Sequence, residues 1–119
     1  MYVENQLGGL DGCGRIGWVE LSKSGHTYYY AGRRLGKTKS GYKYNCIDET
    51  SSDRYWVSGP SKTGHDKLYG GLVEIDEDAR DAYWTTVRGE PSLVAQRAYV
   101  SGASTRTGGT TRQVKRRSR

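Results

Sequence analysis

Apolar and polar side chains alternate in several short runs along the chain, and turn residues separate the runs. Residues 15–22 (RIGWVELS) alternate and end at Lys-Ser-Gly, after which residues 26–32 (HTYYYAG) resume an extended, aromatic pattern. Similar runs cover residues 41–48, 53–59 and 67–75. Period-two alternation between turns is typical of half-buried strands joined as hairpins. The pattern therefore predicts several short strands, each with one buried and one exposed face.

One further segment repeats at helical rather than strand spacing. The small or apolar residues that recur there are Ala79, Ala82, Tyr83, Thr86 and Val87. Asp76 precedes them as a favourable N-cap, acidic residues follow in the first turn, and Gly89 provides a stop. The sequence therefore predicts one helix over residues 77–88, which packs Tyr83 on the sheet and leaves Trp84 at the border of that face.

Together these elements predict a mainly β protein with one helix. Short strands without long connections favour a small, strongly bent antiparallel sheet or an SH3-like barrel, with the C-terminal helix packed on it. A hydrophobic content of 34%, with ten Tyr, three Trp and no Phe, predicts a small aromatic core. We expect one domain over residues 14–92, after a flexible glycine-rich lead at residues 1–13 and before a basic tail at residues 93–119 that is disordered when free.

The formal net charge of +6 is unevenly divided along the 119 residues. Residues 1–92 contain 12 Lys or Arg and 13 Asp or Glu, a balance of −1, whereas residues 93–119 contain 7 Lys or Arg and no acid, a balance of +7. The tail offers almost no apolar surface that could offset the entropy of ordering it. Because basic tails bind polyanions through counterion release, this tail favours contact with nucleic acid or a ribonucleoprotein over a purely solubilising role.

The basic, tyrosine-rich stretch at residues 27–44 (TYYYAGRRLGKTKSGYKY) is a second candidate nucleic-acid surface. It contains five Tyr, five Lys or Arg and no acid. Tyrosine rings stack on bases, and Lys or Arg side chains hold phosphates. The expected contacts in and beside this stretch are Lys23, Tyr29, Arg33, Arg34, Lys37, Lys39 and Lys43. The expected phosphate contacts in the tail are Arg112, Lys115, Arg116, Arg117 and Arg119.

Two functional hypotheses follow from these features. The leading one is a non-enzymatic accessory protein that binds nucleic acid or a ribonucleoprotein through the Tyr-rich sheet and the tail. The alternative is a protein-interaction module, such as a phage or host accessory or inhibitor protein, in which Trp18, Tyr29 and Trp56 anchor another chain. Rings exposed beside Arg33 and Arg34 would favour stacking on bases, whereas an uncharged aromatic patch would favour a protein partner.

Localisation is predicted from what the sequence lacks. No apolar run approaches the roughly 20 residues of a membrane span. The first residues have neither the basic start nor the apolar middle of a signal peptide. We therefore expect a cytoplasmic protein without a membrane partner.

Motifs for enzymatic or metal chemistry are weak. Residues 12–17 (GCGRIG) fit G-x-G-x-x-G, but dinucleotide binding needs a preceding strand and a following helix that the pattern does not predict. The cysteines and histidines lack the paired spacing of a zinc site, and the acids at residues 74–78 lack the glycine and distal glutamate of a calcium loop. We therefore expect no enzymatic activity, catalytic residue, metal, cofactor or small-molecule substrate.

A weak internal repeat relates two parts of the chain. Residues 18–32 (WVELSKSGHTYYYAG) and residues 56–71 (WVSGPSKTGHDKLYGG) share Trp-Val, a Ser-Lys-Ser/Thr-Gly-His segment and a later Tyr. If the two segments form equivalent turns, Lys23 and Lys62 occupy equivalent loop tips. Two such basic tips would either contact one phosphate backbone or serve only solubility.

Three segments carry a resemblance to a known family. GWVELSKSGHTYYYAGRRL, YWVSGP and VEIDEDARDAYW resemble a family of short uncharacterised bacterial proteins with a G-x-V-E-x-S-K-x-G opening and a Y-W-x-S-G centre. The resemblance covers residues 14–88. Some members carry the name of a thiamine-dependent isoprenoid-precursor synthase, an enzyme that requires large α/β domains. The resemblance therefore implies no activity, cofactor or site residue for this chain.

Overall fold

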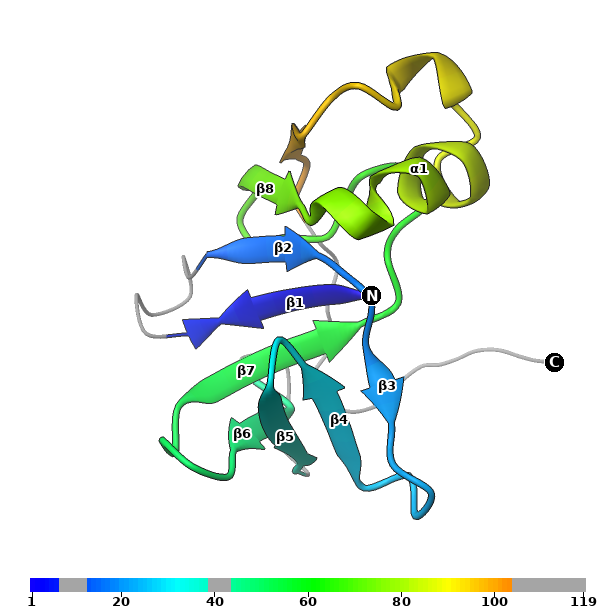
Figure 1. Cartoon of the computed structure of the whole chain (residues 1–119). Helices are drawn as coiled ribbons and strands as arrows, with labels where there is room; N and C mark the ends of the chain where they lie inside the picture. Colours follow the sequence, from blue (N-terminus) through cyan, green and yellow to red (C-terminus); the bar gives the residue numbers. More distant parts are fainter. Residues whose placement is uncertain (7–12, 39–43, 104–119) are drawn as a thin grey trace, which may run out of the picture.

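The structure is a computed structural model and describes residues 1–6, 13–38 and 44–103 (Figure 1). Its strands are β1 (Tyr2–Asn5), β2 (Gly14–Ile16), β3 (Glu20–Leu21), β4 (Thr27–Tyr30), β5 (Arg33–Lys37), β6 (Cys46–Asp48), β7 (Arg54–Ser58), β8 (Gly71–Ile75) and β9 (Ala98–Ser101). A 3-10 turn (Glu77–Ala79), α1 (Arg80–Ala82) and a π-helical turn (Tyr83–Val87) follow one another without a break, and a second 3-10 turn covers Pro91–Leu93. Within the described part of the chain, no helix has the length and apolar character needed to cross a membrane.

All nine strands belong to one sheet, in the order β3-β4-β5-β6-β7-β1-β2-β8-β9. The sheet curls strongly into a half-barrel, which confirms the predicted mainly β fold with a bent sheet and one helix (Figure 1). Neighbouring strands are antiparallel, apart from the parallel pair β2 and β8. Parallel neighbours need a long crossover, and the connection from β2 to β8 contains all of β3 to β7. Hairpin patterns in the sequence do not predict such a pair.

The fold extends beyond both predicted domain limits. β1, which we expected in the flexible lead at residues 1–13, is a central strand paired with β7 and β2. β9, which we expected in the disordered tail at residues 93–119, pairs with β8 and buries Tyr99. The predicted limits at residues 14 and 92 are therefore too narrow. The limit at residue 92 follows the change in net charge along the chain. Net charge does not indicate whether alternate side chains are buried, as they are in β9.

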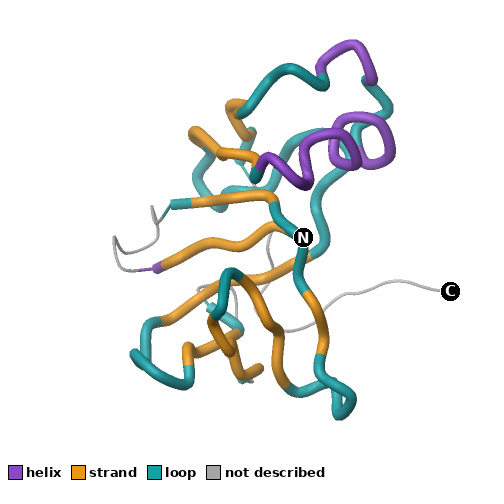
Figure 2. Tube along the Cα trace, in the orientation of Figure 1, coloured by secondary structure: helices purple, strands orange, loops and turns teal. Residues whose placement is uncertain are grey.

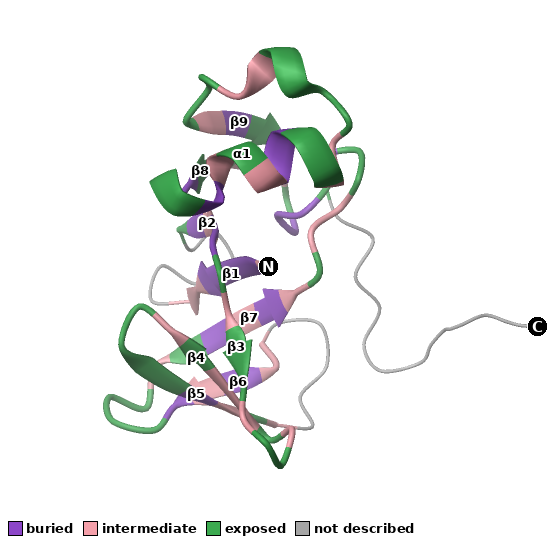
Figure 3. Ribbon diagram, turned by 45° about the vertical axis from the view of Figure 1, so that its right-hand side comes forward, coloured by how far each residue is buried: buried purple, intermediate pink, exposed green. Residues whose placement is uncertain are grey.

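The core has two parts, which lie on opposite faces of β1. The first consists of Tyr2, Ile16, Val73, Ile75, Ala79, Tyr83, Trp84 and Tyr99. The second consists of Val3, Leu35, Cys46, Tyr55 and Val57, which confirms the predicted burial of one face of β7. Tyr2 and Val3 are both buried, and Figure 3 draws β1 largely in the colour of buried residues. Because the two residues are consecutive, their side chains point to opposite faces of the strand, so β1 is buried on both faces.

The helical segment at residues 77–87 is the predicted helix, and it packs beside β2 and β8 (Figure 2). Trp84 is nevertheless as deeply buried as Tyr83, and Thr86 is exposed. The Arg88 N–H donates to the Tyr83 carbonyl, five residues earlier, which is the bond of a π-helical turn. This wider turn brings two consecutive aromatic side chains into the core. The expected border position of Trp84 and the expected burial of Thr86 are therefore wrong.

Asp76 links distant parts of the curled sheet. Its side chain does not cap the helix as expected. The carboxylate instead accepts hydrogen bonds from the Tyr30 hydroxyl of β4 at 2.6 Å and from Arg15 Nε of β2 at 2.7 Å. Burial and the bond to Asp76 raise the pKa of Tyr30. A Cβ on Gly17 would lie 2.4 Å from Asp76 Oδ2 and 2.5 Å from Tyr30 Cε1, so glycine is what allows this close approach.

The two Ser-Lys-Ser/Thr-Gly-His segments form the same turn. The Gly25 N–H donates to the Ser22 carbonyl at 2.9 Å, and the Gly64 N–H donates to the Ser61 carbonyl at 3.4 Å. Both glycines have a φ of +78°, in the left-handed region that favours glycine. The first turn joins β3 to β4, whereas the second lies in the connection from β7 to β8. The repeat therefore extends to the turns but not to the strands around them.

Candidate functional site

The basic, tyrosine-rich stretch does not form one surface. Leu35 of β5 is buried in the second part of the core, so Arg33 and Lys37, two residues away on either side, belong to the same face of the strand. Arg34 lies on the opposite face, with Tyr29 of β4 as its cross-strand neighbour. The predicted phosphate contacts are therefore divided between the two faces of the sheet.

Acidic side chains pair with both arginines of this stretch. Arg33 Nη1 lies 2.8 Å from Asp48 Oδ2, and Arg34 Nε lies 3.0 Å from Glu49 Oε1. The hydrogen bonds to these carboxylates raise the pKa of each arginine. Asp48 and Glu49 come from β6 and the turn that follows it, outside the stretch at residues 27–44. Two of the five positive charges of this stretch are therefore paired with acids of β6 and the turn that follows it.

The other predicted contacts have separate environments. The Tyr29 side chain is 37% exposed, and its ring centroid lies 5.6 Å from the guanidinium carbon of Arg34. The Lys37 ammonium lies 4.8 Å from the centroid of the Tyr28 ring, and Lys23 is exposed in its turn. The contacts that fall outside the described residues are Lys39, Lys43, Arg112, Lys115, Arg116, Arg117 and Arg119. Of the predicted contacts that lie in the described residues, Tyr29 and Arg34 are the ring and the cation that the structure places together.

The buried carboxylate of Asp48 gives stability a dependence on pH. It accepts hydrogen bonds from Arg33 and from the backbone N–H groups of Thr50 and Ser51, and the Arg33 bond is the main reason that the pKa of Asp48 is lowered. A carboxylate whose pKa is lower in the folded state stabilises the fold above its unfolded pKa of about 3.9. This contribution is lost as the pH falls below about 4, through the folded pKa.

We therefore expect Asp48→Asn to be less stable than the wild type at pH 7 and to approach it as the pH falls below about 4. Urea denaturation at a series of pH values measures the difference. Glu49→Gln, on the exposed side of the same turn, is the control and should change stability much less. If the difference in stability between Asp48→Asn and wild type stayed constant from pH 7 to pH 3, Asp48 would not be the source of this pH dependence.

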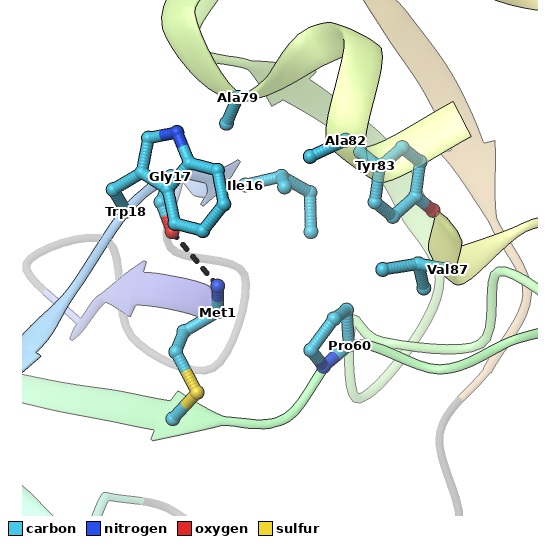
Figure 4. A pocket seen from close by; sticks show the side chains of 9 residues that line it. All are labelled: Met1, Ile16, Gly17, Trp18, Pro60, Ala79, Ala82, Tyr83 and Val87. Atoms are coloured by element: carbon cyan, nitrogen blue, oxygen red, sulfur yellow. Dashed lines mark hydrogen bonds between the residues drawn. The ribbon is translucent and has the colours of Figure 1, made fainter. Parts of the chain in front are cut away.

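An apolar pocket opens between the helical segment and the start of the sheet (Figure 4). The residues that line it are Met1, Ile16, Gly17, Trp18, Pro60, Ala79, Ala82, Tyr83 and Val87. The centre of a water-sized molecule can move through about 60 Å³ of this space. A single water needs only about 10–15 Å³ on that measure, so the pocket has room for a group larger than one water molecule.

The polar groups around the pocket are directed to other partners. The Met1 ammonium donates to the Gly17 carbonyl at 2.8 Å, and burial lowers the pKa of this ammonium. The Tyr83 hydroxyl accepts a hydrogen bond from Arg88 Nη1 at 2.9 Å. No side chain that lines the pocket carries a charge. The cavity therefore suits an apolar group rather than an ion.

Trp18 forms one wall of the pocket although 59% of it is exposed. Its indole Nε1 donates to the Asp78 carbonyl at 2.9 Å, which holds the ring against the start of the helical segment. A ring that is already held in one orientation loses little conformational entropy when a partner covers it. Exposed, oriented tryptophans are frequent anchors of protein interfaces.

An acidic rim adjoins the pocket on the helical segment. We define it as Glu77, Asp78 and Asp81, which are exposed; the first two precede the pocket-lining Ala79 in the chain, and Asp81 lies between Ala79 and the pocket-lining Ala82. In the part of the chain that the structure describes, none of the three carboxylates forms an ion pair. The site thus combines an apolar cavity with carboxylates on the adjoining helical segment that form no ion pair within the described residues.

Sequence reasoning found only part of this site. Trp18 was among the three proposed anchor residues, but Trp56 is half-buried, packs against the first part of the core and donates to Ser58 Oγ at 3.0 Å. Met1 and Pro60 were not predicted, because they reach the pocket from distant parts of the chain. The signal in the sequence that points to an exposed Trp18 is its position directly after Gly17 and shortly before Glu20.

The cysteines do not join in a site. Cys13 is exposed, whereas Cys46 is buried, and burial raises the pKa of its thiol to about 11. Such a thiol stays protonated at neutral pH and is a poor nucleophile. Over residues 1–6, 13–38 and 44–103, no three His, Cys, Asp or Glu side chains come together as metal ligands.

Comparisons with protein-family models, with curated proteins and with solved structures each give no match. The resemblance to short bacterial proteins over residues 14–88 therefore stays a prediction. The function has to be argued from the geometry of the pocket and its surroundings.

Proposed function

We propose that this protein is a protein-interaction module that binds an apolar side chain of a partner in the pocket beside Trp18. The observation that carries the proposal is the exposed Trp18 ring, held by the Asp78 carbonyl at the edge of a cavity that is lined by uncharged side chains. A partner side chain that fills the cavity also covers the ring, so both surfaces are removed from water together. Burial of apolar surface in this way is the main source of affinity at interface anchors.

The acidic rim supports a particular class of partner. Three carboxylates beside the cavity favour an apolar residue that is flanked by Lys or Arg in the partner chain. Charges at the border of an interface act mainly on the association rate and on specificity, and salt screens them. We therefore expect affinity to fall with ionic strength without being abolished, because the apolar contact is insensitive to salt.

The same charges argue against a phosphate backbone at this site. Phosphate oxygens would be repelled by the acidic rim, and Arg33 and Arg34 already have carboxylate partners on the sheet. The described surface therefore supports a protein partner better than a nucleic acid. Nucleic-acid binding by the tail at residues 93–119 stays a prediction.

Selection of peptides from a random displayed library on the full-length protein tests the proposal. We expect the enriched peptides to share one Val, Leu, Ile or Met with Lys or Arg on either side. Ala82→Leu should fill the cavity without changing charge or helix propensity, and Trp18→Ala should remove one wall. Each variant should weaken the selected peptides by about tenfold or more, which corresponds to about 1.4 kcal/mol of binding free energy.

Thr86→Leu is the matched control for Ala82→Leu, because Thr86 lies on the same helical segment, is exposed and does not line the pocket. It should leave peptide affinity unchanged. Selected peptides that bind wild type and Ala82→Leu equally well would place the interface elsewhere and overturn the proposal. Enrichment of no peptide motif would overturn it as well.

A further inference from the structure

The C-terminal tail contains the type of segment that the pocket is proposed to bind. Residues 112–119 (RQVKRRSR) place Val114 among basic residues, with Arg112 before it and three basic residues directly after it. No acid occurs after residue 92. One aliphatic side chain with basic neighbours on both sides is complementary to an apolar cavity with an acidic rim.

A series of contacts links the end of the described part of the chain to one residue that lines the pocket. The Gly102 N–H donates to the Gly64 carbonyl at 3.0 Å. Gly64 in turn lies against the side chain of Arg88, since a Cβ on Gly64 would be 2.8 Å from Arg88 Nη1. Arg88 Nη1 donates to the hydroxyl of Tyr83, which lines the pocket. Three successive contacts therefore connect the residue after β9 to the wall of the cavity.

The remaining chain is long enough to reach the cavity. From Ala103 to Val114 there are eleven peptide steps, and an extended chain spans at most about 3.3–3.6 Å for each, or about 36–40 Å in all. This reach is similar to the longest extent of the fold, 38 Å. The tail can therefore enter the pocket without any rearrangement of the sheet.

Charge and tethering both favour such contact. Residues 104–119 contain six Lys or Arg and no acid, a balance of +6, and the acidic rim has no ion-pair partner within the described residues. A short tether within one chain keeps a segment at an effective concentration in the millimolar range. Docking within one chain is thus favourable even where the free segment would bind only weakly.

We infer that Val114 and its basic neighbours occupy the pocket of their own chain, so that the module is self-covered until a partner with the same chemistry displaces the tail. This inference rests on the proposed function of the pocket. Beyond that function, it means that the tail competes with the partner for the pocket. The sequence around Val114 then indicates which residues the partner's binding motif contains.

Paramagnetic relaxation in the full-length protein tests the inference. The probe is a nitroxide attached at Gln113→Cys in a Cys13→Ser background, since Cys46 is buried and stays unlabelled. We expect strong, distance-dependent broadening of the amide signals of Gly17, Trp18, Ala82 and Val87. The amide of Lys37, on β5, serves as the reference and should be affected much less.

Variants separate docking from random encounters of the tail. Val114→Asp and Ala82→Leu should each abolish the excess broadening at the pocket, whereas Thr110→Asp, a matched change elsewhere in the tail, should reduce it only slightly. Broadening that is absent, or equal at Lys37 and at the pocket, would overturn the inference. Broadening that is found only when unlabelled isotope-enriched protein is mixed with spin-labelled protein would show docking between chains and would overturn it too.

This result can be distinguished from failure of the proposed function. If peptides with a basic-flanked aliphatic residue bind the pocket but the tail does not broaden it, the module binds other chains and is not self-covered. If neither peptides nor the tail respond to Ala82→Leu, both proposals are wrong. If both respond, deletion of residues 104–119 should also strengthen binding of the selected peptides several-fold, because their competitor is removed.

Discussion

Replacing Trp84 with alanine is expected to lower the free energy of unfolding by about 3 to 5 kcal/mol, the range found for large aromatic side chains deleted from a core. Trp84 is 1% exposed, and its ring centroid lies 5.1 Å from that of Tyr83 and 6.2 Å from that of Tyr99, both edge to face. Its indole Nε1 donates to the Gln96 carbonyl at 2.9 Å. The substitution would leave a large cavity and would also release the segment that leads to β9.

Trp18→Ala is the matched control, because it removes the same side chain from an exposed position. It should cost less than about 1 kcal/mol, as surface substitutions usually do. Urea denaturation of both variants, followed by circular dichroism, measures the two values. A larger loss for Trp18→Ala than for Trp84→Ala would contradict the core position that the π-helical turn gives to Trp84.

Gly17→Ala should destabilise the protein by about 1 to 3 kcal/mol, the usual cost of adding a methyl group to a tightly packed site. The new Cβ would lie within 2.5 Å of the Asp76 carboxylate and the Tyr30 ring. Neither group can move freely, because they are hydrogen-bonded to each other and Asp76 is also held by Arg15. The methyl group would therefore disrupt the contact between β4 and the segment that follows β8.

Gly59→Ala provides the comparison. No atom lies within 4 Å of a Cβ at this position, and its φ is not in the left-handed region. It should change stability by less than about 0.5 kcal/mol. Thermal unfolding of the two variants distinguishes the cases, and equal effects would mean that the contact between Tyr30 and Asp76 contributes little.

The sequence predicts those strands that have one buried and one exposed face. Tyr55 and Val57 are buried as their alternation indicates. β1 was missed because Tyr2 and Val3 are both buried, on opposite faces, and a strand of this kind shows no alternation. Trp84 was misplaced because the phase of a regular helix does not hold through a π-helical turn.

The candidate site was less accessible to sequence reasoning than the fold. The basic stretch was interpreted by its local charge, but Asp48 reaches Arg33 only because β6 pairs with β5 so that Leu35 lies opposite Asp48. The register between two strands depends on residues far apart in the chain, so no short segment predicts it. The pocket likewise depends on the packing of Pro60 against the helical segment, which local patterns do not report.

The central position of β1 has a consequence for how the protein acquires its structure. β1 is synthesised before its partner strand β7, in which Val57 lies opposite Val3, and its other partner β2 pairs in turn with the still later β8. Proteins dominated by such distant pairings have high contact order and fold over milliseconds to seconds. During synthesis on the ribosome, the apolar side chains of β1 therefore emerge well before either of their packing surfaces is complete. The side chains of β1 are therefore fully covered only after β8 and β9 have been synthesised, because Val73, Ile75 and Tyr99 belong to the same part of the core as Tyr2.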